Sequence, residues 1–219
     1  MLHNLQKPTI YLITSGETNL QTTPATDDFL KVLRLIEAAV SAGIGLVQIR
    51  EKNLNSRVLF QLASSAAKIA EGSDTRVLVN DRADIAAAAG VDGVHLTTHS
   101  LPTEIIRHTF GDDFLIGVST HSPGEAVTAR ANGADFVVFG PVFETPSKSG
   151  YREPAGLDQL RKVAAQVAGW PVLALGGVNL KRVGACLEAG AQGVAAIRMF
   201  SDPAQLKQTA KAIREMSSE

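Results

Sequence analysis

The chain has 219 residues, 45% of them hydrophobic, which suits one globular domain with a sizeable core. Its 21 basic and 22 acidic residues give a formal net charge of −1, which argues against a nucleic-acid partner, because such partners usually select a basic face. The sequence contains neither a run of about 18 apolar residues nor a signal-peptide pattern, and its single cysteine, Cys186, cannot form an internal disulfide, so we expect a cytoplasmic protein without a membrane span.

Short apolar segments alternate with helical patterns along the whole chain. Several apolar segments are nearly continuous, as is typical of parallel strands covered on both faces. The predicted strands are 9–13, 45–49, 76–80, 92–96, 114–118, 135–139, 171–175 and 193–197. The predicted helices are 27–42, 56–72, 82–89, 102–110, 123–132, 157–168, 180–189 and 203–216. This alternation predicts the α/β fold class and a single (β/α)8 TIM barrel over residues 1–219, with an open doubly wound sheet as the structural alternative.

An internal repeat supports the alternation of helix and strand. The segments 42–47, 89–94, 132–137 and 189–194 resemble one another, each with glycine as its second residue. A glycine at this place can end a helix in the left-handed conformation and lead through a tight turn into a buried strand.

Two predicted loops are longer than a barrel connection needs, namely 14–26 and 140–156. Both follow strands, so both lie at the C-terminal end of the barrel, where enzymes of this fold place their sites. Such loops are lids or simple insertions. Thr145, Ser147 and Lys148 favour a lid for the second loop, because hydroxyl groups and an ammonium group suit the enclosure of an anion.

Adjacent glycines, Gly176 and Gly177, follow the seventh predicted strand, and Arg198 follows the eighth. Loops at these places commonly bind phosphate in this fold. Glycines let backbone N–H groups approach an oxyanion closely. The alternative is a turn that only leads into the next helix, and the position at the C-terminal end favours phosphate binding.

The second predicted strand ends in alternating polar residues, Gln48, Arg50 and Lys52. An extended chain sends these three side chains to one side, toward the barrel opening. The alternative is a solvated charge run at the surface. Together with Lys148, these basic groups concentrate positive charge in a chain that is nearly neutral, which indicates a diphosphate or two separate phosphates as ligand.

The third predicted strand ends in Asn80 and Asp81. A carboxylate beside an amide suits Mg²⁺, which prefers oxygen ligands and often bridges to substrate phosphates. Capping of the following helix is the alternative use of either residue. The basic groups at the end of the second strand favour the metal–phosphate interpretation.

Ser119 and His121 follow the fifth predicted strand. Ser119 can donate a hydrogen bond to a phosphate oxygen, and His121 can transfer protons near neutral pH or merely pack in the loop. His95 lies within a strand and is expected to be structural.

At these residues the chain resembles the thiamine phosphate synthases and their relatives, the thiazole tautomerases. The resemblance spans nearly the whole chain, and its motifs lie at 9–14, 48–52 (QIREK), 80–82, 93–96 (GVHL), 117–121, 139–148 (FGPVFETPSK), 174–178 and 193–197. It implies phosphorylated pyrimidine and thiazole substrates and Mg²⁺ as cofactor. A thiazole phosphate nitrogen would displace the diphosphate of hydroxymethylpyrimidine diphosphate, giving thiamine phosphate and pyrophosphate without a protein nucleophile.

The resemblance also implies residue roles. The residues holding the pyrimidine diphosphate would be Gln48, Arg50, Lys52, Asn80, Ser119 and Lys148. The residues holding the thiazole phosphate would be Thr145, Ser147, Gly176 and Ile197, beside the Gly177 and Arg198 proposed above. Asp81 would hold Mg²⁺. The predicted catalytic residues are Arg50, Lys52, Ser119, His121 and Lys148.

Two departures from the synthase pattern keep other functions open. Ser100 stands where the synthases usually have a second carboxylate ligand for Mg²⁺, and Arg198 stands where they have a serine. The tautomerases share the VFET segment at 142–145 and use a histidine that matches His121. We therefore predict a synthase, with a thiazole tautomerase or a non-catalytic phosphate-binding barrel as alternatives. The sequence leaves open whether the chain forms a homo-oligomer.

Overall fold

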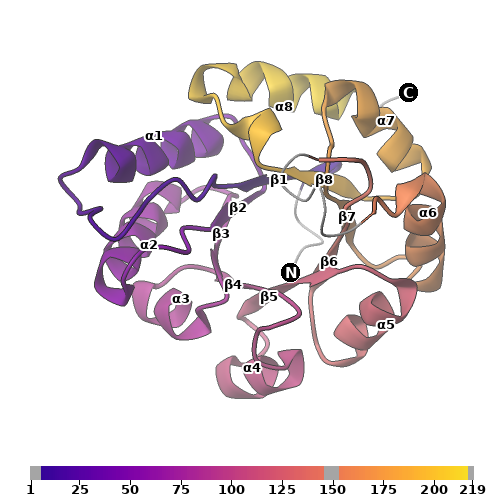
Figure 1. The fold of residues 1–219 in the computed structure, drawn as a ribbon, viewed down its shortest axis with the longest axis horizontal. Helices are drawn as coiled ribbons and strands as arrows, with labels where there is room; N and C mark the ends of the chain where they lie inside the picture. Colours follow the sequence, from indigo (N-terminus) through magenta and orange to yellow (C-terminus); the bar gives the residue numbers. More distant parts are fainter. Residues whose placement is uncertain (1–5, 146–152, 217–219) are drawn as a thin grey trace.

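Eight parallel strands form a closed barrel at the centre of the molecule, and helices surround it (Figure 1). The structure is a computed structural model that describes residues 6–145 and 153–216. Each strand pairs with the next in chain order, and β8 pairs with β1 to close the barrel. This closure confirms the predicted (β/α)8 TIM barrel and excludes the open sheet.

The observed elements follow the predicted order. The strands are β1 (Thr9–Ile13), β2 (Leu46–Ile49), β3 (Arg76–Asn80), β4 (Gly93–Leu96), β5 (Leu115–Thr120), β6 (Phe136–Phe139), β7 (Val172–Ala174) and β8 (Gly193–Ala196). The α-helices are α1 (Asp27–Ser41), α2 (Ser56–Ala70), α3 (Ala83–Ala89), α4 (Thr103–Phe110), α5 (Pro123–Ala131), α6 (Gly156–Gln166), α7 (Leu180–Glu188) and α8 (Leu206–Glu215). Short 3₁₀ turns, η3 (Arg198–Phe200) and η4 (Pro203–Gln205), separate β8 from α8.

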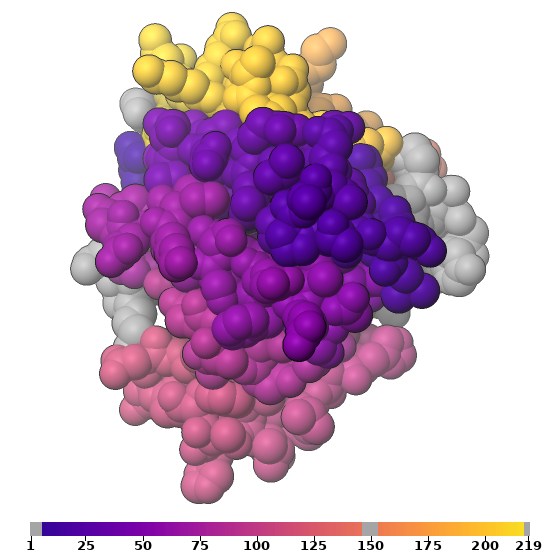
Figure 2. Space-filling view, turned by 90° about the vertical axis from the view of Figure 1, so that its left-hand side faces the viewer, coloured from indigo at the N-terminus to yellow at the C-terminus, as the bar shows by residue number. Residues whose placement is uncertain are grey.

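The alternating residues of each strand build two cores. In β1, Tyr11 and Ile13 point into the barrel, where they pack with side chains such as Leu46 and Phe136. Ile10 and Leu12 point outward into the larger core between strands and helices. Figure 2, viewed from the side of α1 and α2, shows these helices covering the barrel there. Burial on both faces explains why the strands are nearly continuous apolar runs.

The four repeated turns have the predicted backbone. Gly43, Gly90, Gly133 and Gly190 all have positive φ, between 67° and 93°, directly before a strand. This left-handed conformation costs glycine little, so the chain can turn sharply from helix to strand.

Strand β5 ends two residues later than predicted, at Thr120. Pairing of Ser119 with Val138 and of Thr120 with Phe139 keeps this end of the strand extended. Ser119 therefore lies on a rigid strand rather than in a loop. Within residues 6–145 and 153–216, no helix is long and apolar enough to cross a membrane.

Candidate active site

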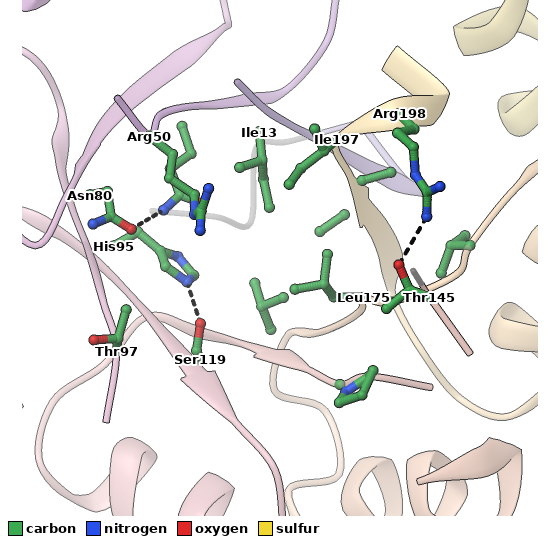
Figure 3. A pocket seen from close by; sticks show the side chains of 18 of the residues that line it. Ile13, Arg50, Asn80, His95, Thr97, Ser119, Thr145, Leu175, Ile197 and Arg198 are labelled. Atoms are coloured by element: carbon green, nitrogen blue, oxygen red, sulfur yellow. Dashed lines mark hydrogen bonds between the residues drawn. The ribbon is translucent and has the colours of Figure 1, made fainter. Parts of the chain in front are cut away.

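A cavity of about 600 Å³ opens at the C-terminal ends of the strands (Figure 3). Its size is in the usual range for a small-molecule site. Many predicted site residues line it: Gln48, Arg50, Lys52, Asn80, Ser119, His121, Thr145, Gly176, Gly177, Ile197 and Arg198. Ser147 and Lys148 lie outside the described residues. The barrel thus brings together side chains and loops from most of its strands around one cavity.

One side of the cavity, here called the basic side, consists of Gln48, Arg50, Lys52 and Asn80. The Gln48 side-chain amide donates to Asn80 Oδ1 over 3.0 Å, which links the ends of β2 and β3. Arg50 is half-buried and Lys52 is exposed. Period-2 alternation therefore places the two cations of QIREK on the cavity as predicted, where they favour a polyanion.

Glu51 alternates with these residues and points away from the cavity. Its buried carboxylate accepts from the backbone N–H groups of Gly16 and Thr18, at 3.2 and 3.3 Å, and from Thr18 Oγ1 at 2.6 Å. It thereby fixes the loop after β1, which contributes Ser15 and Glu17 to the cavity lining. The loop is anchored to β2 by a charge-assisted network.

We expect Glu51→Ala to lower the free energy of unfolding by about 2–3 kcal/mol, because donors around a missing carboxylate lose their acceptor. Urea denaturation measures this loss. Glu37→Ala, at an exposed position of α1, is the matched control and is expected to be neutral. Equal stability of both variants would mean that Glu51 does not hold the loop.

The opposite side of the cavity, here called the glycine side, consists of Thr145, Gly176, Gly177, Ile197 and Arg198. Gly176 and Gly177 have φ values of 97° and 63°. A side chain at Gly176 would come within 2.5 Å of Pro141, and one at Gly177 would collide with the Glu144 carbonyl oxygen. Only glycine fits this backbone, which exposes peptide groups to the cavity.

Backbone hydrogen bonds join the loops after β6 and β7 on the glycine side. Val142 N–H donates to the Leu175 carbonyl over 2.8 Å, and Phe143 N–H donates to the Gly176 carbonyl over 3.0 Å. Arg182 of α7 donates to the Gly177 carbonyl over 2.7 Å and stacks on the Phe143 ring at 4.6 Å. The glycine loop is therefore held by an arginine that is not part of the cavity lining.

Substitution of Gly177 by alanine is expected to raise the KM for a phosphate bound on the glycine side by about tenfold or more, because left-handed strain and the collision displace the loop. Gly169→Ala is the matched control, since Gly169 has φ of 77° but lies in open space between α6 and β7. Steady-state kinetics measure the KM of each variant, which should be raised in Gly177→Ala and unchanged in Gly169→Ala. An equal KM in both variants would argue against a ligand at Gly177.

Arg198, in η3 after β8, reaches the loop after β6 across the glycine side. Its guanidinium Nη2 donates to Thr145 Oγ1 over 2.9 Å (Figure 3). A guanidinium has several N–H donors in a planar fork, so this single bond leaves donors for a phosphate. Arg198 adds positive charge where Gly176 and Gly177 offer backbone groups.

The Ser119 hydroxyl forms a hydrogen bond with a buried histidine, His95. Its Oγ lies 2.9 Å from His95 Nε2, and His95 Nδ1 lies 3.2 Å from Tyr11 Oη. Burial lowers the pKa of His95 to about 3 and raises the pKa of Tyr11 well above 10, so both groups are neutral near pH 7. His95, expected to be structural, is buried but also lines the cavity.

The His121 ring is oriented by the backbone carbonyl of Gly140, which follows β6. Its Nδ1 contacts the Gly140 carbonyl oxygen, which can only accept, so Nδ1 carries a proton. The His121 backbone N–H donates to Glu125 over 2.7 Å. His121 also lines the cavity.

Asp81, the predicted metal ligand, is exposed at the end of β3 and is not part of the cavity lining, although its neighbour Asn80 is. Its φ of 63° is unusual for a residue other than glycine, and its backbone N–H donates to the His95 carbonyl. In the part of the chain described here, no group of three or more His, Cys, Asp or Glu residues could hold a metal. A single carboxylate still fits Mg²⁺, which typically uses one or two carboxylates with substrate phosphates and water.

Ser100 lies in the turn after β4 and is not part of the cavity lining. Its Oγ accepts from Thr97 N–H over 2.7 Å and contacts Thr97 Oγ1, closing the turn after β4. Glu17, which sequence reasoning missed, is a carboxylate in the cavity lining. Its place in a long polar loop gave no signal, because the pairing of β1 with β2 and the hydrogen bonds of Glu51 bring that loop to the cavity, and no local pattern reports them.

A family model described as thiamine monophosphate synthase matches residues 10–200. The chain belongs to this family. The match confirms the family predicted from the motifs along the chain, QIREK and FGPVFETPSK among them.

Relatives of the synthase family cover most of the chain. A relative from Geobacter sulfurreducens is 45% identical over 78% of this chain and 81% of its own length. A thiamine-phosphate synthase from a Synechocystis species is 35% identical over 99% of this chain, which spans only 60% of that protein. The solved thiamine phosphate pyrophosphorylase from Pyrococcus furiosus has a TM-score of 0.78 and 27% identity, covering 95% of this chain and 96% of that one.

Proposed function

We propose that this protein transfers the hydroxymethylpyrimidine group from its diphosphate to the ring nitrogen of a thiazole phosphate, giving thiamine phosphate and pyrophosphate. The observation that carries the proposal is the presence of two anion-binding sides on one cavity (Figure 3). The protein is a transferase of the thiamine-phosphate synthase type, as the sequence predicted and as its relatives are named.

The basic side binds the pyrimidine diphosphate in this proposal. Arg50 can clamp two phosphate oxygens with its planar guanidinium, and Lys52 supplies a second cation. Gln48 and Asn80 hold one another and present their remaining polar atoms to the same ligand. As the carbon–oxygen bond to the diphosphate breaks, negative charge grows on the leaving group, and these fixed groups stabilise it. Lys148, outside the described residues, is proposed to complete this cluster.

The glycine side binds the thiazole phosphate. Backbone groups at Gly176, Gly177 and Ile197 and the Arg198 guanidinium surround the phosphate, and the Thr145 hydroxyl, with Ser147 outside the described residues, completes the site. Binding there places the thiazole nitrogen opposite the pyrimidine carbon that loses its diphosphate. Proximity and orientation replace a protein nucleophile, which the reaction does not need.

Asp81 is proposed to hold Mg²⁺ together with oxygens of the diphosphate. The ion, when bound, neutralises charge that develops on the departing diphosphate. Asp81 is exposed and directly follows Asn80 of the basic side. Its left-handed backbone, fastened by the bond to the His95 carbonyl, fixes the direction in which the carboxylate leaves β3.

A second candidate function, thiazole tautomerisation, is favoured by the geometry of His121. The Gly140 carbonyl orients the ring with its proton on Nδ1, and His121 lines the cavity, where a histidine base would be needed. Isomerising a thiazole carboxylate phosphate would need this base and the glycine side, but not Arg50 or Lys52. The concentration of cations on the basic side favours the synthase over this function.

Assays with purified protein separate these functions. The synthase predicts thiamine phosphate from both substrates in the presence of Mg²⁺, with no product when either substrate is omitted. The tautomerase predicts conversion of the thiazole carboxylate isomer without metal and its loss in His121→Ala. If neither reaction occurs while thiazole phosphate still raises the melting temperature, the protein is a phosphate-binding barrel and the proposal is wrong.

A further inference from the structure

Three hydrogen-bonded side chains, here called the relay, cross the interior of the barrel and end at the cavity. Tyr11 comes from β1, His95 from β4 and Ser119 from β5. The Tyr11 and His95 rings lie 5.7 Å apart between centroids, and both pack against Phe136. A side chain at Gly117 would collide with His95 and Phe136, so the missing side chain makes room for this cluster. The arrangement is rigid because it is packed on every side.

The buried hydrogen bonds of Tyr11 and His95 fix the positions of the protons on these side chains. Tyr11 is fully buried, and among the described residues its hydroxyl has one partner, His95 Nδ1. If Nδ1 carried the proton, the Tyr11 hydroxyl proton would be buried without an acceptor, which is unfavourable. With the proton on Nε2, Tyr11 donates to Nδ1 and His95 Nε2–H donates to Ser119 Oγ.

The hydroxyl proton of Ser119 is then directed away from His95. Since Nε2 already carries a proton, His95 cannot accept the Ser119 proton, and Ser119 is left with a donor for a ligand in the cavity. We infer that Tyr11 and His95 are positioning residues that make Ser119 a hydrogen-bond donor to an anionic oxygen, rather than a nucleophile activated by histidine. The identity of that anion as the substrate diphosphate rests on the proposed function. The proton positions do not depend on it.

Histidine-labelled protein tests the proton positions directly. Long-range ¹H–¹⁵N correlation spectra distinguish the two neutral histidine tautomers, and the signal missing in His95→Gln identifies His95. We expect the Nε2–H form in the wild type and a shift toward Nδ1–H in Tyr11→Phe, which removes only the hydroxyl. A wild-type His95 with its proton on Nδ1 would overturn the inference.

Pyrophosphate affinity tests the effect on Ser119. With inorganic pyrophosphate and Mg²⁺ as probe, Ser119→Ala is expected to weaken binding about tenfold and Tyr11→Phe about three- to tenfold, as loss of one hydrogen bond to a charged group implies. The double variant should bind no more weakly than Ser119→Ala, because Tyr11 acts through Ser119. Ile36→Val, buried in α1 away from the relay, is the control for general destabilisation and should bind like the wild type.

Failure of this inference and failure of the proposed function give different results. Independent, additive effects of Tyr11→Phe and Ser119→Ala would overturn the relay even in a protein that makes thiamine phosphate. A protein that makes no thiamine phosphate, yet shows the Nε2–H form and non-additive binding losses, would support the relay and refute the proposed function.

Discussion

Arg50→Ala is expected to lower kcat/KM for the pyrimidine diphosphate by about 10²- to 10³-fold, the effect of removing one preorganised group that stabilises developing negative charge. Of the two cations on the basic side, Arg50 is expected to have the larger effect, because it is half-buried and directly follows β2, whereas Lys52 is exposed. Its backbone N–H donates to Thr14 Oγ1 over 2.8 Å, which fixes the point from which the side chain extends.

Steady-state kinetics with each substrate varied in turn measure this effect. The KM for the thiazole phosphate should change little, because Arg50 lies across the cavity from Arg198 (Figure 3). Arg57→Ala removes a cation from the exposed surface of α2 and is the matched control. Wild-type kinetics in Arg50→Ala would remove the basis for a diphosphate on the basic side.

Asp81→Asn is expected to lower the rate at limiting Mg²⁺ by about 10²-fold, because loss of about 2.7 kcal/mol of metal-dependent stabilisation corresponds to that factor. Raising the Mg²⁺ concentration should restore part of the activity, since asparagine keeps one oxygen ligand. The Mg²⁺ dependence of the initial rate measures both effects. Asp84, paired with Arg82 at 2.6 Å, offers the control variant Asp84→Asn, whose Mg²⁺ dependence should match the wild type.

An Asp81→Asn variant with unchanged Mg²⁺ dependence would show that another group binds the ion. Glu17 is then the next candidate, because it is a carboxylate of the cavity lining. Chelation of Mg²⁺ should abolish synthesis in the wild type. Activity that survives chelation would mean that the cations of the basic side stabilise the leaving diphosphate without metal.

Much of this site could be predicted because it depends on local pattern. Alternation along an extended strand placed Gln48, Arg50 and Lys52 on one side, and the structure has them there. Glycines before the strands marked the turns that start β2, β4, β6 and β8. Parallel strands that all end at the same opening then bring the residues after them together.

The contacts that the sequence did not reveal join segments far apart in the chain. Tyr11 and His95 are 84 residues apart, and only closure of the barrel puts β1 and β4 across one interior. Each residue looks like an ordinary core aromatic or a structural histidine within its own strand. Glu51 similarly finds its donors more than 30 residues away, in a loop whose length was predicted but whose attachment was not.

The central claim is that one cavity binds two different anions at the same time. Titration calorimetry of the wild-type protein with inorganic pyrophosphate and Mg²⁺, before and after saturation with thiazole phosphate, tests it most directly. The account predicts that each ligand binds once per chain and that neither excludes the other. Competition between the two for a single site would contradict it.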